Sequence, residues 1–224
     1  MDCVKKHFQD EAKSFDARVV KSLPYYHEML EALVSALPFQ QNEIKKIVDL
    51  GCGTGTISQK LKEHFPNARI TCVDFSENMV AIARTKLERY ADMNYVISDV
   101  RAFDFTGYDA VVTSLTLHHL RQGTQKLKLY RKMYAGLNKK GAVSFADLVL
   151  GETGDLQRLN LAKWKEFLSR HLCEKDIQER YGRYKNEDRP FKLSQELAWL
   201  KKAGFKNLDV IWKNYHFAVF CGRK

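Results

Sequence analysis

A glycine-rich turn between an apolar run and a helical pattern constrains this chain more than any other feature. Residues 48–55 read VDLGCGTG and follow an apolar segment that starts at residue 44. Such a turn lets a ligand approach the backbone closely at the carboxyl end of a buried strand, which only glycine permits. The spacing is G-x-G-x-G, whereas loops that bind a dinucleotide pyrophosphate read G-x-G-x-x-G.

Strand and helix patterns alternate along the chain from this point. Helices are predicted at residues 56–65, 76–90 and 121–137, and strands at residues 44–50, 69–73, 95–97, 109–112 and 142–149. This alternation predicts parallel βαβ units, and hence an α/β fold with a doubly wound, mostly parallel, Rossmann-like sheet. Residues 208–212 and 217–221 are expected to add an antiparallel hairpin at the sheet edge.

Two helical segments fall outside this alternation. Residues 1–40 predict an N-terminal helical cap, and residues 151–190 predict a helical insertion before the last two strands. Because no linker-like segment separates them from the rest, residues 1–224 are expected to form a single domain.

Charge, apolar stretches and cysteine content indicate which partners and which cellular location to expect. The formal net charge is +10, but the lysines are dispersed, so a nucleic-acid partner is possible and not favoured. No apolar stretch reaches the length of a membrane span and no secretory signal is recognised, so we expect a cytoplasmic protein without a membrane partner. The five cysteines are scattered and predict neither a disulfide framework nor a metal site. A monomer or a homodimer is expected.

Polar residues close the next three predicted strands in chain order. Asp74 lies nineteen residues beyond Gly55, where an acidic side chain can accept hydrogen bonds from two ribose hydroxyls. After the third strand, Asp99 can accept from an adenine amino group and Val100 offers a backbone N–H. Ser114 ends the fourth strand. Because carboxyl ends of parallel strands meet at one edge, these residues should share one ligand.

The ordered motifs resemble those of class I S-adenosylmethionine (SAM)-dependent methyltransferases. The resemblance covers residues 44–150 and rests on residues 48–55, 73–79, 98–99 and 108–112. It implies SAM as the cofactor. The glycine turn then flanks the methionine portion, and the residues after strands two and three bind ribose and adenine. The expected cofactor-binding residues are Asp49, Gly51, Cys52, Gly53, Gly55, Asp74, Phe75, Met79, Asp99, Val100 and Ser114.

Two segments outside these motifs indicate a more specific group of relatives. Residues 15–19 and 199–205 are similar to bacterial carboxy-SAM synthases of tRNA wobble-uridine modification and to their methyltransferase relatives. Those synthases bind the extra carboxylate with an arginine on the inserted helices. An alignment anchored on residues 203–205 places Tyr181 there, between Arg180 and Arg183, and this departure favours ordinary SAM.

The loop at residues 115–120 carries the candidate catalytic residues, His118 and His119. Either imidazole could remove a proton from the acceptor. Adjacent histidine side chains are expected to point in different directions, so no metal site is predicted. Arg18 is expected beside the cofactor, paired with its methionine carboxylate.

The acceptor pocket is expected between the N-terminal helices and the insertion. The candidate substrate residues are Tyr25, Tyr26, Tyr181 and Arg183.

The leading hypothesis is a SAM-dependent methyltransferase acting on a small or medium-sized molecule, because a helical cap suits such an acceptor. The alternatives are a tRNA-modification enzyme or carboxy-SAM synthase, and a non-catalytic SAM-binding protein. A nicotinamide dehydrogenase is disfavoured by the loop spacing.

Overall fold

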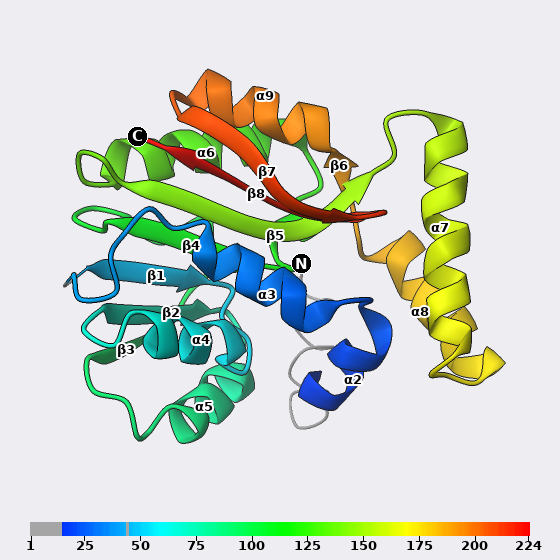
Figure 1. The fold of residues 1–224 in the computed structure, drawn as a ribbon, viewed down its shortest axis with the longest axis horizontal. Coiled ribbons are helices and arrows are strands. Elements are labelled where there is room, and N and C mark those ends of the chain that lie inside the picture. Colours follow the sequence, from blue (N-terminus) through cyan, green and yellow to red (C-terminus); the bar gives the residue numbers. More distant parts are fainter. Residues whose placement is uncertain (1–14, 44) are drawn as a thin grey trace.

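A mixed, mostly parallel sheet forms the centre of the molecule (Figure 1). The computed structural model describes residues 15–43 and 45–224. The strand order is β3-β2-β1-β4-β5-β8-β7, and β6 pairs with β5 beside this path. The strands are β1 (Lys46–Leu50), β2 (Arg69–Asp74), β3 (Met93–Ile97), β4 (Ala110–Ser114), β5 (Ala142–Leu150), β6 (Phe191–Lys192), β7 (Lys206–Asn214) and β8 (Phe217–Arg223).

The pairing confirms the predicted fold class. Strands β3, β2, β1, β4 and β5 pair in parallel, and β8 pairs antiparallel with both β5 and β7. The chain order reverses between β1 and β4, and ligands of open α/β sheets bind outside the strand carboxyl ends at such a point. The two-residue β6 was not predicted, because so short a strand leaves no alternating pattern.

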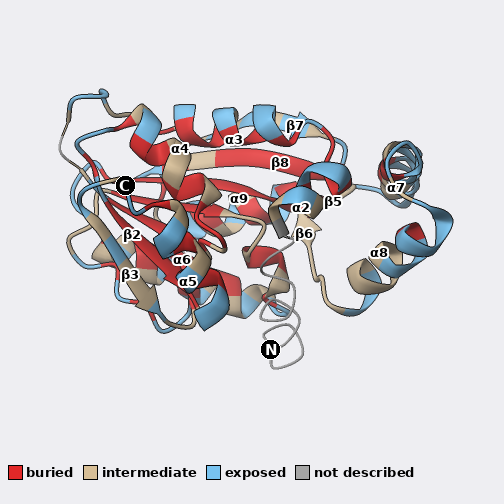
Figure 2. Ribbon diagram, turned by 90° about the horizontal axis from the view of Figure 1, so that it is seen from below, coloured by how far each residue is buried: buried red, intermediate tan, exposed pale blue. Residues whose placement is uncertain are grey.

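Helices cover both faces of the sheet, and the strands between them are buried (Figure 2). One apolar core lies under α3, α4 and α5, and a second lies under α6 and α9. The helices are α2 (Phe15–Ser22), α3 (Tyr26–Ser35), α4 (Thr56–His64), α5 (Glu77–Lys86), α6 (Gly123–Gly136), α7 (Gly154–Ser169), α8 (Glu174–Asn186) and α9 (Leu193–Ala203), with the 3₁₀ turn η2 (Leu117–His119).

The predicted insertion forms α7 and α8, which project beyond the end of the sheet (Figure 1). The indole N–H of Trp164 in α7 donates to the carbonyl oxygen of Ser22 at 2.8 Å, which joins α7 to the end of α2. Tyr181 of α8 stacks on Trp164 with ring centroids 5.3 Å apart. Residues 1–14 of the predicted N-terminal cap lie outside the described residues.

Helix α2 is also fastened to the glycine turn. The Asp16 carboxylate accepts from the hydroxyl of Thr54 at 2.5 Å and forms an ion pair with Lys86 of α5 at 2.5 Å. The insertion and α2 are therefore held close to the carboxyl ends of the strands.

Within the described part of the chain, no helix combines the length and the apolar character needed to cross a membrane.

Candidate active site

The glycine turn leaves β1 in a conformation that side chains disfavour. Gly51, Gly53 and Gly55 have φ angles of 76°, 52° and 85°. A Cβ at Gly51 would overlap the side chain of Thr116, so this position also needs glycine for space. The N–H groups of Gly51 and Cys52 donate to the carbonyl oxygen of Val73 at 2.7 and 3.0 Å, which docks the turn on β2.

Asp74 at the end of β2 holds the turn in place. One of its carboxylate oxygens accepts from the Gly53 N–H at 2.9 Å, and the other accepts from the Ser76 N–H at 2.9 Å. Burial raises the pKa of Asp74, although these N–H groups act in the opposite direction. The Ser76 hydroxyl in turn accepts from the Met79 N–H and caps α5, as its position before the helix predicts.

A cavity opens at the carboxyl ends of β1, β2 and β4. The structure brings nine of the twelve expected cofactor-binding residues to its wall: Gly51, Cys52, Gly53, Asp74, Phe75, Met79, Asp99, Val100 and Ser114. Thr116, which was not predicted, also lines this cavity. Its hydroxyl donates to the Ser114 carbonyl oxygen at 2.9 Å, and its side chain closes the wall against Gly51. We refer to this space as the first cavity.

Three expected cofactor residues lie outside this wall. Asp49 is fully buried behind the turn, where it accepts from the Ser58 hydroxyl at 2.7 Å. Gly55 packs on α5, because a Cβ there would lie 2.9 Å from a methyl carbon of Leu87. Arg18 lines a neighbouring cavity instead of the first. The prediction that these three contact the cofactor is therefore not supported by their positions.

Asp99 lines the first cavity, and its carboxylate forms an ion pair with the nearby Arg101. The guanidinium of Arg101 pairs with both carboxylate oxygens, at distances down to 2.5 Å. Hydrogen bonding to Arg101 lowers the pKa of Asp99 below its usual value. This carboxylate is therefore a fixed negative charge at the edge of the cavity.

A second cavity lies between α2, η2 and the insertion. Three arginines, Arg18, Arg180 and Arg183, reach its wall, together with His118 and Asp188. The two cavities share Leu115 and His119. Leu115 has a φ of 51°, a left-handed conformation that costs energy for a residue with a side chain.

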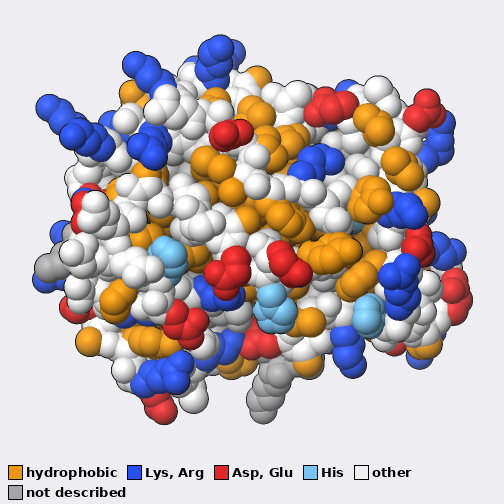
Figure 3. Space-filling model, viewed as in Figure 1, with side chains coloured by type: hydrophobic (Ala, Val, Ile, Leu, Met, Phe, Trp, Pro, Cys, Tyr) orange, Lys and Arg blue, Asp and Glu red, His pale blue; other side chains and the backbone are white. Residues whose placement is uncertain are grey.

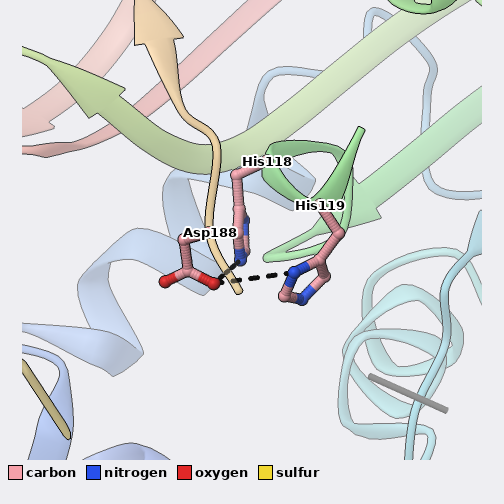
Figure 4. A group of neighbouring side chains, drawn as sticks. All are labelled: His118, His119 and Asp188. Carbon is pink, nitrogen blue, oxygen red and sulfur yellow. Dashed lines mark ion pairs between the residues drawn. The ribbon is translucent and has the colours of Figure 1, made fainter. Parts of the chain in front are cut away.

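The two histidines converge on one carboxylate, so the expectation that they point apart is wrong (Figure 4). Nε2 of His118 and Nδ1 of His119 each lie 3.5 Å from Oδ1 of Asp188. The other nitrogen of His118, Nδ1, lies 2.5 Å from the Asp147 carboxylate. Burial opposes the imidazolium, but Asp147 and Asp188 outweigh burial and raise the pKa of His118. Asp147 and Asp188 were both missed in the sequence analysis.

The expected substrate residues separate in space. Arg183 lines the second cavity and Tyr26 lines the first. Tyr25 is 60% exposed and faces a third, more open hollow. Tyr181 lines none of the three cavities, because its ring packs on Trp164 and its hydroxyl donates to the Leu161 carbonyl oxygen. Tyr181 is therefore a packing residue, which corrects the prediction.

The centre of the chain is similar to a known family of domains. A family model described as a methyltransferase domain matches residues 47–141, which include the glycine turn, Asp74 and the histidine pair. Together with the strand order and the first cavity, this match supports an enzyme with a methyltransferase domain that uses SAM as its cofactor.

Relatives are similar over nearly the whole chain. A carboxy-S-adenosyl-L-methionine synthase of Campylobacter hominis is 29% identical over 226 residues, which cover 99% of this chain and 96% of the relative. A carboxy-S-adenosyl-L-methionine synthase of Nautilia profundicola is 26% identical over the same coverage of both chains. Human N-acetylserotonin methyltransferase, solved in complex with SAM, has the same fold, with a TM-score of 0.61 and 16% identity. This chain spans about half of the human protein, 51% of its length, and 87% of this chain is matched.

A methyl group added at Gly53 should weaken cofactor binding without unfolding the protein. A Cβ at Gly53 meets nothing within 4 Å in the structure, because it points into open space where Gly53 lines the first cavity. We expect the Gly53→Ala variant to bind S-adenosylhomocysteine at least about tenfold more weakly by calorimetry, a loss of about 1.4 kcal/mol.

Gly107→Ala is the matched control. Gly107 also has a positive φ, 80°, and open space at its Cβ, but it lies outside all three cavities. The two variants should lose similar stability from backbone strain. Equal cofactor affinity in both would contradict the position assigned to the cofactor.

Replacing Asp49 by Asn should stabilise the cofactor-free protein, and more so as the pH rises. Burial raises the pKa of Asp49 from 3.8 to about 7, so the folded state resists ionisation that the unfolded state undergoes freely. The stability of the wild type relative to Asp49→Asn should thus fall between about pH 4 and pH 7, by at most about 4 kcal/mol. Urea unfolding at pH 5 and pH 8 measures this difference.

Proposed function

We propose that this enzyme transfers the methyl group of SAM to a small or medium-sized acceptor, with residues 1–224 acting as one domain. The cofactor lies in the first cavity and the acceptor in the second. The observation that carries this proposal is the shared wall of the two cavities at Leu115 and His119. Methyl transfer is an in-line displacement, so donor and acceptor must meet at one point, and the shared wall supplies that point.

The first cavity offers each part of SAM a matching partner. The backbone of Gly51 and Gly53 flanks the methionine portion, and the Asp74 carboxylate accepts from the ribose hydroxyls. Met79 packs on the adenine, which Val100 borders on its other side. These roles are those that the resemblance to class I methyltransferases implies, and the chemistry of the side chains is compatible with them.

The histidine pair receives the proton that an acceptor hydroxyl or amine loses. Bound SAM would supply the methyl group and leave as S-adenosylhomocysteine, and an imidazole nitrogen would take the proton of the acceptor. His119 borders both cavities and is nearest to the meeting point. His118 lies behind it and is oriented by Asp147.

Carboxy-SAM synthesis is a second candidate, favoured by the full-length similarity to proteins of that name. Carboxy-SAM synthesis is disfavoured because the position expected to bind the extra carboxylate holds Tyr181, a packing residue, instead of an arginine. The face in Figure 3 offers a tRNA no continuous basic surface, because lysine and arginine side chains are scattered there among acidic and apolar ones. A non-catalytic SAM-binding protein would not need two cavities that share a wall.

Isotope transfer distinguishes these candidates. The protein is incubated with SAM labelled in its methyl group, together with either a filtered small-molecule cell extract or bulk tRNA. We expect label in a small molecule and an equal amount of S-adenosylhomocysteine, both absent with Asp74→Ala. Label in tRNA, or a product with the mass of carboxy-SAM, would contradict the proposed reaction in favour of the corresponding alternative.

A further inference from the structure

His118, His119 and Asp188 present three ligand atoms to one point in space. The two histidines lie on η2 after β4, and Asp188 follows α8 of the insertion (Figure 4). Their ligand atoms all lie within 4.8 Å of one another. Among residues 15–43 and 45–224, no other group of three histidine, cysteine or acidic side chains converges in this way. We propose that this cluster is a binding site for a divalent first-row transition metal ion, of which Zn²⁺ and Co²⁺ are examples.

The spacing fits a metal ion better than a set of direct hydrogen bonds. Ligand atoms on a tetrahedral ion, at bond lengths of about 2.0–2.1 Å, lie about 3.4 Å apart. The two nitrogens here each lie 3.5 Å from the same Asp188 oxygen, which is at the upper limit for a hydrogen bond. All three atoms lie within 4.8 Å of one another, so the two imidazoles would also have to move toward each other for all three atoms to bind one ion.

Asp147 prepares His118 to act as a ligand. Its carboxylate lies 2.5 Å from Nδ1, so Nδ1 carries the hydrogen and donates it. The lone pair that a metal needs is then on Nε2, which faces Asp188. A carboxylate behind a ligating histidine is the usual arrangement in metal sites, where it fixes both the tautomer and the ring orientation.

The backbone holds Asp188 against the histidines in advance. The N–H of Arg189 donates to the carbonyl oxygen of His118 at 2.8 Å, which joins the segment after α8 directly to η2. The three side chains are only 5%, 14% and 17% exposed for His118, His119 and Asp188. Binding of an ion would therefore cost little entropy for ordering these three side chains.

The donor set selects the kind of ion. Two imidazole nitrogens and one carboxylate suit zinc, iron, cobalt or nickel, whereas Mg²⁺ and Ca²⁺ prefer oxygen ligands only. Three protein ligands leave a coordination position open, as in catalytic metal sites. All three residues line the second cavity, so a bound acceptor can reach that position.

The charges around the cluster set the affinity. Asp147 and Asp188 supply two carboxylates, while Arg18, Arg180 and Arg183 line the same cavity and repel a dication. We therefore expect a site that is occupied at micromolar concentrations and emptied by a chelator. The role of the ion rests on the proposed methyl transfer and changes only the fate of the proton. With the ion bound, the histidines would act as ligands, the ion would lower the pKa of an acceptor hydroxyl, and the proton would pass to water.

Cobalt titration tests the site without any assay of activity. Tag-free, chelator-treated protein is titrated with Co²⁺ and followed by visible absorption. We expect one Co²⁺ per chain. His119→Ala and Asp188→Asn should each weaken binding at least about tenfold, and Asp147→Asn should weaken it about 10–100-fold through His118. The matched control is His171→Ala, which removes an exposed imidazole away from the cluster and should leave binding unchanged.

Calorimetric binding of S-adenosylhomocysteine is measured on every variant. It verifies the fold of the first cavity and separates the two proposals. Absence of saturable Co²⁺ binding in protein that binds S-adenosylhomocysteine, or equal binding by wild type, His119→Ala and Asp188→Asn, would overturn the metal site alone. Loss of S-adenosylhomocysteine binding by the wild type would instead overturn the proposed function.

Discussion

The Asp74 carboxylate joins the end of β2 to the glycine turn and to the start of α5. The first cavity exists only if these three segments keep their relative positions. The carboxylate accepts one hydrogen bond from the glycine turn after β1 and another from the start of α5. Because it is buried, losing either N–H would leave an unsatisfied charge in a poorly solvated place. The turn can therefore keep its left-handed glycines, and the first cavity keeps its shape.

The second cavity depends on contacts between segments that lie far apart in the sequence. Trp164 joins the insertion to α2, and Arg189 joins the segment after α8 to the carbonyl oxygen of His118. These contacts position three arginines and Asp188 beside the loop after β4. Leu115, held at a positive φ, sits where the two cavities meet. The fold thus sets the first cavity, at the ends of the strands, beside the second cavity, which helices largely enclose.

Most of the sheet and of the first cavity could be predicted from the sequence, because both depend on local patterns. A strand followed by a glycine turn, and acidic residues at strand ends, need no knowledge of distant segments. The second cavity could not be predicted in this way. Asp147 lies within the apolar pattern of β5, and Asp188 lies in a polar segment after α8, so neither carries a local signal.

The wrong predictions instead concern the direction in which single side chains point. Tyr181 and Arg183 lie two residues apart on α8, and helical geometry turns one toward Trp164 and the other toward the second cavity. Asp49 belongs to the motif, but strand alternation points its side chain into the core toward Ser58. The histidines were expected to diverge, as neighbours do in a strand or α-helix, but the tight turn of η2 lets both rings face Asp188.

The central claim is that the first cavity holds SAM through the turn that Asp74 fixes. Its most direct test is calorimetric titration of the purified protein with SAM, S-adenosylhomocysteine and NADH, beside the Asp74→Ala variant. The structure predicts that SAM and S-adenosylhomocysteine bind, that NADH does not, and that the variant loses binding of both. Binding of NADH without SAM, or unchanged SAM affinity in Asp74→Ala, would contradict it.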